Sequence, residues 1–190
     1  MAAALWLLVA CASALRPSPL KPLIIFGRPG AGKTTIADAL LKHADAEDAQ
    51  GVDLDVCVPQ WMRDNFARGI YPSLDERRTF AAAAADHLDA VATSTGRCVV
   101  SFSFVNDDLR DYFRHRFPEA DWVLVDTSEN DAAERIARRE GHFYKGPTAA
   151  EPDRGSEWAF APVAFDHVRL DGRRPVEDNV RALAPFLTSH

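Results

Sequence analysis

One short stretch of the chain combines residue types that suit the binding of phosphate groups. Glycine occupies positions 27, 30 and 32, and Lys33 and Thr34 follow the last of these glycines. Glycines let the backbone curl with its N–H groups pointing inward, where they and a lysine ammonium can hold the phosphates of a nucleotide. A threonine hydroxyl at this position can ligate Mg²⁺. The residues predicted to bind ATP are Gly27, Arg28, Pro29, Gly30, Ala31, Gly32, Lys33, Thr34 and Thr35.

Two carboxylates, Asp53 and Asp55, stand two residues apart near the end of a predicted second strand. Both can face the crevice at the carboxyl edge of a parallel sheet, where the acceptor of a phosphoryl group would lie. One acid beside Mg²⁺ and one receiving the proton of an acceptor hydroxyl would suit phosphoryl transfer. We expect Asp53 to serve the metal with Thr34 and Asp55 to serve the acceptor; the opposite assignment, or a solvated role for either acid, stays open.

An α/β fold would bring these residues together, and the sequence has the alternation of strand and helix patterns that is typical of such a fold. Apolar strand-like runs alternate with helical patterns, which is typical of a parallel sheet covered by helices. The sequence therefore predicts a single α/β domain with the P-loop NTPase fold, a parallel five-stranded sheet with helices on both faces and a mobile lid. The predicted strands are 23–26, 51–54, 98–104, 122–126 and 168–171, and the predicted helices are 32–43, 60–67, 74–94, 107–117, 130–140 and 176–187.

Composition narrows the class of partner. The chain has 190 residues, a net charge of −6 and 47% hydrophobic residues, which suits one domain with a sizeable core. An acidic balance argues against general binding of nucleic acid or of anionic membranes. The three widely spaced cysteines indicate neither a disulfide framework nor a zinc site. We therefore expect a small-molecule partner, no nucleic acid and no stable membrane association, with a homodimer as an open alternative.

The N-terminal residues have the pattern of a leader. An uncharged apolar run precedes Ala12-Ser13-Ala14, which has the small-x-small form of a signal-peptidase site, but a basic n-region is missing. We expect residues 1–19 to be a leader or an extension, and residues 20–190 to form the kinase domain. Such a leader would send the protein to an organelle or plastid, or into the secretory route.

Beyond the P-loop, the chain resembles the gluconate kinase family, relatives of the shikimate kinases, over residues 23–145. After the two aspartates, residues typical of the family recur at the family's spacing without a gap. They continue up to the run Gly141-His142-Phe143, where the family begins its lid. The positions that carry this spacing are Asp53, Asp55, Pro59, Gly69, Arg77, Ser103, Arg110, Asp111, Pro118, Arg135 and Arg139. The resemblance implies the family's cytoplasmic location if no leader is present.

The resemblance also implies roles for the basic residues. Arg135 and Arg139 lie four residues apart, on one face of a helix, and would close onto the nucleotide phosphates with a lid spanning about 135–162. Arg77 and Arg110 are candidates for clamping an acceptor carboxylate, because a guanidinium forks onto a carboxylate. His142 is a further candidate for acceptor binding.

Three positions depart from the family pattern, and they leave the acceptor open. Val58, Asn65 and Asn106 stand where the family usually has basic residues. The expected activity is phosphorylation of a hydroxyl on gluconate or a related sugar acid, using ATP and Mg²⁺. A kinase for a shikimate-like acid, a nucleoside or a nucleotide remains an alternative, as does a non-catalytic nucleotide-binding regulatory domain. A nucleic-acid end kinase is disfavoured by the acidic charge.

Overall fold

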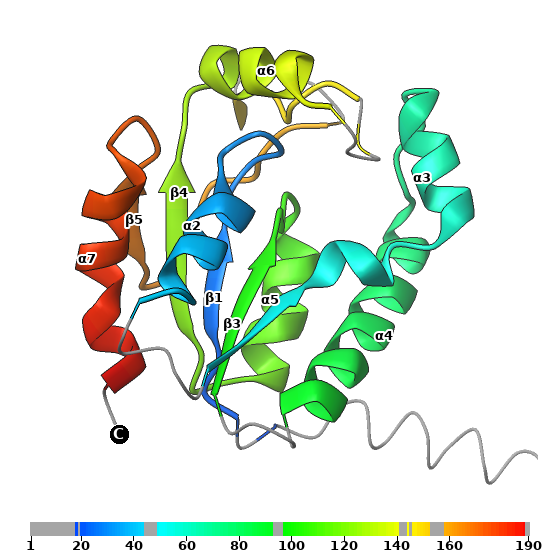
Figure 1. Cartoon of the computed structure of the whole chain (residues 1–190). Helices are drawn as coiled ribbons and strands as arrows, with labels where there is room; N and C mark the ends of the chain where they lie inside the picture. Colours follow the sequence, from blue (N-terminus) through cyan, green and yellow to red (C-terminus); the bar gives the residue numbers. More distant parts are fainter. Residues whose placement is uncertain are drawn as a thin grey trace, which may run out of the picture.

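The computed structural model describes residues 18, 20–43, 49–92, 97–140, 144, 146–152 and 158–188 (Figure 1). Five parallel strands form one sheet in the order β2-β3-β1-β4-β5. This confirms the predicted P-loop NTPase fold. The strands are β1 (Leu23–Phe26), β2 (Ala49–Asp53), β3 (Arg97–Phe102), β4 (Asp121–Asp126) and β5 (Val168–Asp171), and the helices are α2 (Lys33–Leu40), α3 (Gln60–Ala67), α4 (Leu74–Ala92), α5 (Asp107–Arg116), α6 (Glu129–Arg138) and α7 (Val176–Thr188), with a 3₁₀ helix at Leu54–Cys57.

The central strand β1 explains why the sheet has helices on both faces. All four of its residues are buried, and alternate side chains point to opposite faces of a strand. Ile24 and Phe26 pack with side chains of α3, α4 and α5. Leu23 and Ile25 pack with side chains of α2 and α7 on the other face (Figure 1).

The parallel register brings the ends of the strands, and the loops that follow them, to one edge of the sheet. Phe26 at the end of β1 pairs with Phe102 at the end of β3, and Asp53 at the end of β2 pairs with Ser101. Helix α6 lies across this edge (Figure 1). The residues that follow β1, β2 and β3 therefore lie at this edge of the sheet, and the loop after β1 lies beneath α6.

The element boundaries differ from the predicted ones at a few positions. Strand β3 ends at Phe102, and Phe104, predicted to be the last residue of that strand, has φ +43°, which a strand does not allow. The segment Leu54–Cys57 forms a 3₁₀ helix that the sequence pattern did not predict. No helix in the described part of the chain has the length and apolar character needed to cross a membrane. The predicted leader lies outside the described residues except for Ser18.

Candidate active site

The P-loop connects β1 to α2 and has a backbone that depends on glycine. Gly30 and Gly32 have φ +87° and +98°, in the left-handed region that favours glycine. A Cβ atom on Gly30 would lie 2.3 Å from the backbone oxygen of Ala132 in α6. The loop therefore passes directly under α6, and α2 begins at Lys33 with its N-terminal N–H groups at the site, as phosphate binding requires.

Lys33 places an ammonium group inside this loop. Its side chain is buried, and Nζ donates a hydrogen bond to the backbone oxygen of Arg28 at 3.0 Å. Burial, the largest cause, lowers the pKa of Lys33, as does the charge of Arg139, while Asp55 and Asp53 raise it; the net result is a pKa of about 8 instead of 10.5. With a pKa of about 8, Lys33 is still mostly protonated at neutral pH, so the loop offers a positive charge to an entering anion.

Thr34 and Asp53 form a pair of oxygen ligands beside the loop. The Thr34 hydroxyl donates to Asp53 Oδ2 at 3.4 Å. Hydroxyl and carboxylate oxygens are hard ligands of the kind that Mg²⁺ uses together with water and phosphate oxygens. These two side chains therefore fit the metal role predicted for them.

Asp55 lies on the 3₁₀ helix rather than on the strand, and two contacts fix its position. Asp53 Oδ1 accepts a hydrogen bond from the Asp55 backbone N–H at 3.0 Å and so caps this helix. Arg63 of α3 donates to the backbone oxygens of Asp55 at 2.7 Å and of Val58 at 2.9 Å. A 3₁₀ helix thus holds Asp55 near Asp53 at the edge of the sheet, where the sequence predicted both acids. Arg63 of α3 stabilises this helix.

One pocket of about 70 Å³ collects these groups. Lys33, Thr34, Asp53, Asp55 and Arg139 all line it. Aromatic side chains complete its wall; these are Phe66, Phe102, Tyr144 and Trp158. The P-loop lysine, the Thr34–Asp53 pair, a second carboxylate and a guanidinium therefore face one pocket.

The two arginines near the end of α6 take different positions. Arg135 donates from Nη1 to the backbone oxygen of Ala31 at 2.9 Å and from Nη2 to that of Gly172 at 2.7 Å. Arg139 lies beyond the helix, with the extended angles φ −71° and ψ 132°, and lines the cavity. The prediction that both share one helix face is wrong, because α6 ends at Arg138 and the chain turns Arg139 toward the site.

Arg110 does not have the role predicted for it. Its side chain is 0% exposed, and its guanidinium stacks over the ring of Phe160 at 4.5 Å. Its five hydrogen-bond acceptors are Phe104 O, Val105 O, Ala161 O, Pro162 O and Asp107 Oδ1. The structure contradicts a clamp on an acceptor carboxylate, because this guanidinium is fully enclosed and already joins α5 to two loops.

The other predicted acceptor residues are distributed differently. Arg77 forms an ion pair with Asp108 at 2.9 Å and lines a second cavity beside the first. Asn106 lines that second cavity, and Asn65 of α3 accepts a hydrogen bond from Arg68, which follows this helix. His142 lies outside the described residues, and Thr35 is exposed on α2. Val58 is buried and lines both cavities.

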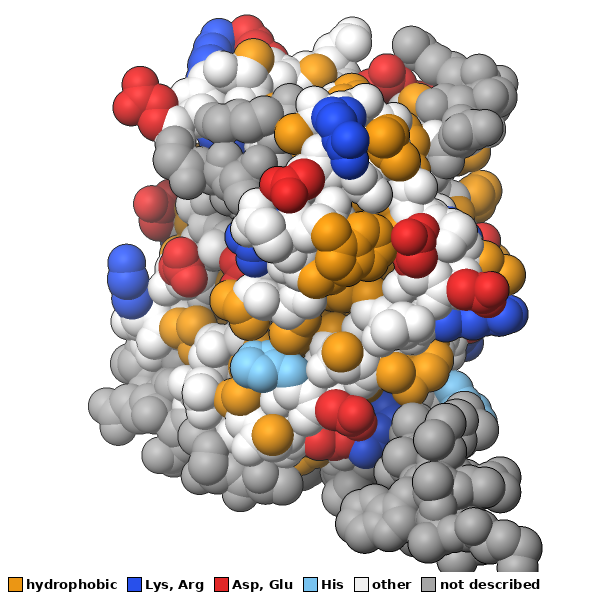
Figure 2. All heavy atoms as spheres, turned by 90° about the vertical axis from the view of Figure 1, so that its right-hand side faces the viewer, with side chains coloured by type: hydrophobic (Ala, Val, Ile, Leu, Met, Phe, Trp, Pro, Cys, Tyr) orange, Lys and Arg blue, Asp and Glu red, His pale blue; other side chains and the backbone are white. Residues whose placement is uncertain are grey.

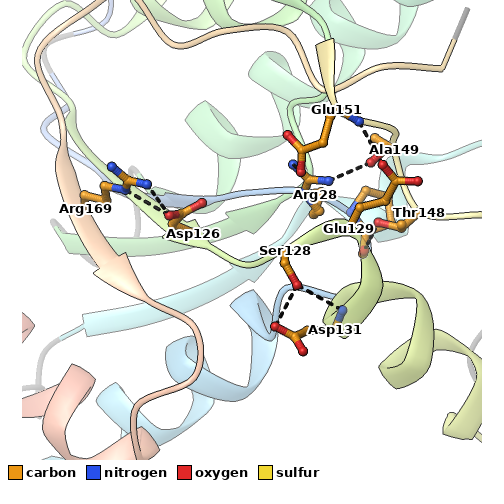
Figure 3. A network of polar contacts seen from close by, with 10 residues as sticks. Arg28, Asp126, Ser128, Glu129, Asp131, Thr148, Ala149, Glu151 and Arg169 are labelled. Atoms are coloured by element: carbon orange, nitrogen blue, oxygen red, sulfur yellow. Dashed lines mark hydrogen bonds and ion pairs between the residues drawn. The ribbon is translucent and has the colours of Figure 1, made fainter. Parts of the chain in front are cut away.

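The segment after α6 binds to the P-loop through contacts that the sequence pattern did not predict. Arg28 is 7% exposed and donates to the backbone oxygen of Ala149 at 3.0 Å, and its guanidinium pairs with Glu151 at 2.8 Å (Figure 3). Thr148 Oγ1 donates to the backbone oxygen of Pro29 at 2.7 Å. The side chain of Arg28 therefore points away from the nucleotide cavity and binds the lid segment, although its backbone belongs to the P-loop.

Aromatic contacts cover the cavity from the lid side, and sequence reasoning did not identify them either. Trp158 stacks on Tyr71 with ring centroids 4.6 Å apart and contacts Phe66 at 5.7 Å. Tyr144 meets the same Phe66 at 5.5 Å. The only sequence signal was the presence of aromatic residues on both sides of the lid, which does not reveal that they meet.

Comparisons with known proteins agree with this geometry. A family model described as an AAA domain matches residues 23–154. A gluconokinase of Gluconobacter oxydans is 29% identical over 126 residues, which cover 65% of this chain and 69% of that protein. Among solved structures, an unliganded sugar kinase from Janibacter sp. has a TM-score of 0.69 at 24% identity, over 90% of this chain and 100% of that one. A gluconokinase from Sinorhizobium meliloti has a TM-score of 0.61 at 24% identity, over 91% of this chain and 94% of that one.

Proposed function

The chain belongs to the AAA domain family, and from this membership and the site geometry we propose that it transfers the terminal phosphoryl group of ATP to a hydroxyl of a small metabolite, gluconate or a related sugar acid. The observation that carries the proposal is the convergence of Lys33, Asp53, Asp55 and Arg139 on one cavity. The relatives named gluconokinase and sugar kinase support the acceptor class.

The nucleotide side of the reaction would be handled by the P-loop and its neighbours. The backbone N–H groups of the loop and the Lys33 ammonium would bind the phosphates, because they form the positive face of the cavity. Thr34 and Asp53 would hold Mg²⁺, which when bound neutralises charge on the phosphate oxygens. Arg139 would balance charge on the transferred group from the lid side of the cavity.

The acceptor side would depend on Asp55. The acceptor oxygen forms a bond to the terminal phosphorus while the bond from that phosphorus to the oxygen of ADP breaks. The hydroxyl proton passes to the Asp55 carboxylate, which its 3₁₀ helix holds at the cavity wall. This reaction depends on positioning and charge rather than on covalent catalysis by the protein.

The experiment that tests this function measures ADP release by the full chain with ATP and Mg²⁺ across sugar acids, shikimate, sugars and nucleosides. We expect release that depends on a sugar acid and is absent in Lys33→Ala. Release stimulated only by a nucleoside or by shikimate would overturn the acceptor class. ATP binding without stimulation by any acceptor would overturn the kinase assignment and favour a regulatory nucleotide-binding domain.

A further inference from the structure

Arg28 belongs to the P-loop, but its guanidinium binds the segment after α6. The residue is 7% exposed, and it is not among the described residues that line the pocket of Lys33. Nη1 donates to the backbone oxygen of Ala149 at 3.0 Å, and Nη2 pairs with Glu151 at 2.8 Å (Figure 3). The guanidinium also lies over the ring of Phe160, 5.7 Å from its centre. A guanidinium with several directional partners holds them in one geometry.

The residues that Arg28 contacts are the two neighbours of Ala150, and Ala150 in turn fixes the backbone of Trp158. Ala150 and Ala159 form a bridge between two parallel segments. The Ala150 N–H donates to the backbone oxygen of Trp158 at 2.8 Å, and the Phe160 N–H donates to the backbone oxygen of Ala150 at 2.9 Å. Arg28 therefore holds this bridge from the side of the P-loop.

The ring of Trp158 forms part of the wall of the pocket that contains Asp55. It stacks on Tyr71, between α3 and α4, with ring centroids 4.6 Å apart. Hydrophobic side chains also gather near the middle of the molecular face that carries α3 and α4 (Figure 2). Hydrophobic packing is non-directional, so it brings the ring to this side of the molecule without fixing its position. The hydrogen bonds of Ala150, which Arg28 supports, supply the direction.

Resting on the proposed kinase function, we propose that Arg28 is a positioning residue for the acceptor. Through Ala149 and Glu151 it holds Trp158 in the pocket wall against which the sugar acid binds. Because the guanidinium lies outside this pocket, its effect on the acceptor passes through Trp158. Loss of the guanidinium leaves the ring less firmly placed, and a misplaced wall residue weakens productive binding of the acceptor.

Steady-state kinetics of Arg28→Met tests this role. The P-loop keeps a separate contact with the segment after α6, from Thr148 Oγ1 to the backbone oxygen of Pro29 at 2.7 Å, so ATP binding depends less on Arg28. We expect KM for gluconate to rise about tenfold and KM for ATP to change by less than about twofold. The matched control is Arg169→Met, which removes a guanidinium that is 70% exposed and pairs with Asp126, and which should change neither KM. An unchanged KM for gluconate in Arg28→Met, or an equal rise in both KM values, would overturn the inference.

A double-mutant cycle shows whether Arg28 acts through Trp158. Trp158→Ala removes the ring and should by itself raise KM for gluconate. We expect Arg28→Met to add less than about twofold to this rise, because the ring that it positions is already absent. If the two single effects multiply in the double variant, Arg28 acts by another route and the inference is wrong.

Glu151→Gln tests the same path if Arg28→Met does not fold. The Glu151 side chain is 41% exposed, so this change weakens the ion pair without disturbing a buried site. We expect KM for gluconate to rise about threefold and KM for ATP to stay constant. A KM for gluconate equal to that of the wild type would then contradict the proposed path.

Fluorescence separates failure of this inference from failure of the proposed function. The emission of Trp158, obtained by subtracting the spectrum of the same protein with Trp158→Ala, reports on the ring without turnover. We expect acrylamide to quench this emission more strongly in Arg28→Met than in the wild type, and Arg169→Met to match the wild type. Stronger quenching without phosphorylation of any sugar acid by the wild type would keep the link between Arg28 and Trp158 and overturn the kinase function. Equal quenching in the wild type and Arg28→Met, with phosphorylation intact, would overturn the inference alone.

Discussion

Lys33 combines burial with a charge that the nucleotide site requires. Burial lowers its pKa to about 8, so the free protein loses this charge within the ordinary working range of pH. We predict that ATP affinity falls as pH rises through about 8, because the neutral amine no longer attracts phosphate. Titration of ATP binding between pH 7 and pH 9 checks this, and Lys33→Met, which lacks the titrating group, should show weak binding with no such fall. A wild-type affinity that stays constant across this range would contradict the prediction.

The same shift makes a second prediction, about stability. Between pH 8 and 10.5 the unfolded chain holds a proton on Lys33 that the folded chain has released. Stability rises with pH wherever the unfolded state binds more protons, so Lys33 contributes an increase in the free energy of unfolding over this range. Urea unfolding of the wild type and of Lys33→Met at several pH values isolates this contribution. The free energy of unfolding of the wild type, relative to that of Lys33→Met, should increase as the pH rises.

The two aspartates offer a prediction that separates their roles. Asp53 contacts Thr34 and caps the 3₁₀ helix, whereas Asp55 faces the cavity from that helix. Asp55→Asn should lower kcat by about a hundredfold or more with little change in ATP affinity, because it removes the proposed proton acceptor. Asp53→Asn should instead raise the Mg²⁺ concentration needed for half-maximal rate. A Mg²⁺ titration of kcat checks both, and an increased Mg²⁺ requirement in Asp55→Asn alone would reverse the assignment.

At the scale of the elements, the sequence predicted well what depends on local pattern. The four buried residues of β1 and the glycine spacing after it were sufficient to place the P-loop between a strand and a helix. The 3₁₀ helix that carries Asp55 was not predictable in this way, because Arg63 stabilises it from a different element. Local periodicity does not encode such a contact.

The contacts of Arg110 could not be predicted from local sequence either. Its position on α5 suited an acceptor clamp, but a position on a helix does not reveal what packs over that helix. In the structure, Phe160 and the carbonyls of residues 161 and 162 enclose the guanidinium from a segment fifty residues away in the chain. One of its acceptors is the carbonyl of Phe104, whose φ of +43° is unfavourable and needs such support.

This enclosure predicts that Arg110 matters for stability. Arg110→Met leaves several buried carbonyls without their donor and should lower the free energy of unfolding by about 3 kcal/mol. Arg114→Met, on the same helix, removes a guanidinium that is 45% exposed and should cost less than about 1 kcal/mol. Urea unfolding of both variants checks this. A loss in Arg110→Met no larger than in Arg114→Met would mean that its hydrogen bonds contribute little to the fold.

At the scale of the whole molecule, the P-loop and the segment after α6, the proposed lid, line the same cavity. Arg28 and Thr148 bind the lid segment to the loop, and Trp158 and Tyr144 pack against Phe66 of α3. The segment after α6 thus contacts both the P-loop and α3. Excluding water from such a site directs the phosphoryl group to the acceptor, because water is the competing nucleophile.

Trp158 gives the means to test this arrangement. Its ring lies flat on Tyr71 and lines both cavities, so Trp158→Ala should open a path for water beside Asp55. We predict that the variant releases more ADP per acceptor phosphorylated than the wild type does, because water then takes part of the phosphoryl flux. Trp61→Ala removes a tryptophan that is 44% exposed on α3 and should leave that ratio unchanged. Parallel measurement of ADP and phosphorylated acceptor gives the ratio; a fall in both products together in Trp158→Ala would mean that the ring positions substrate without excluding water.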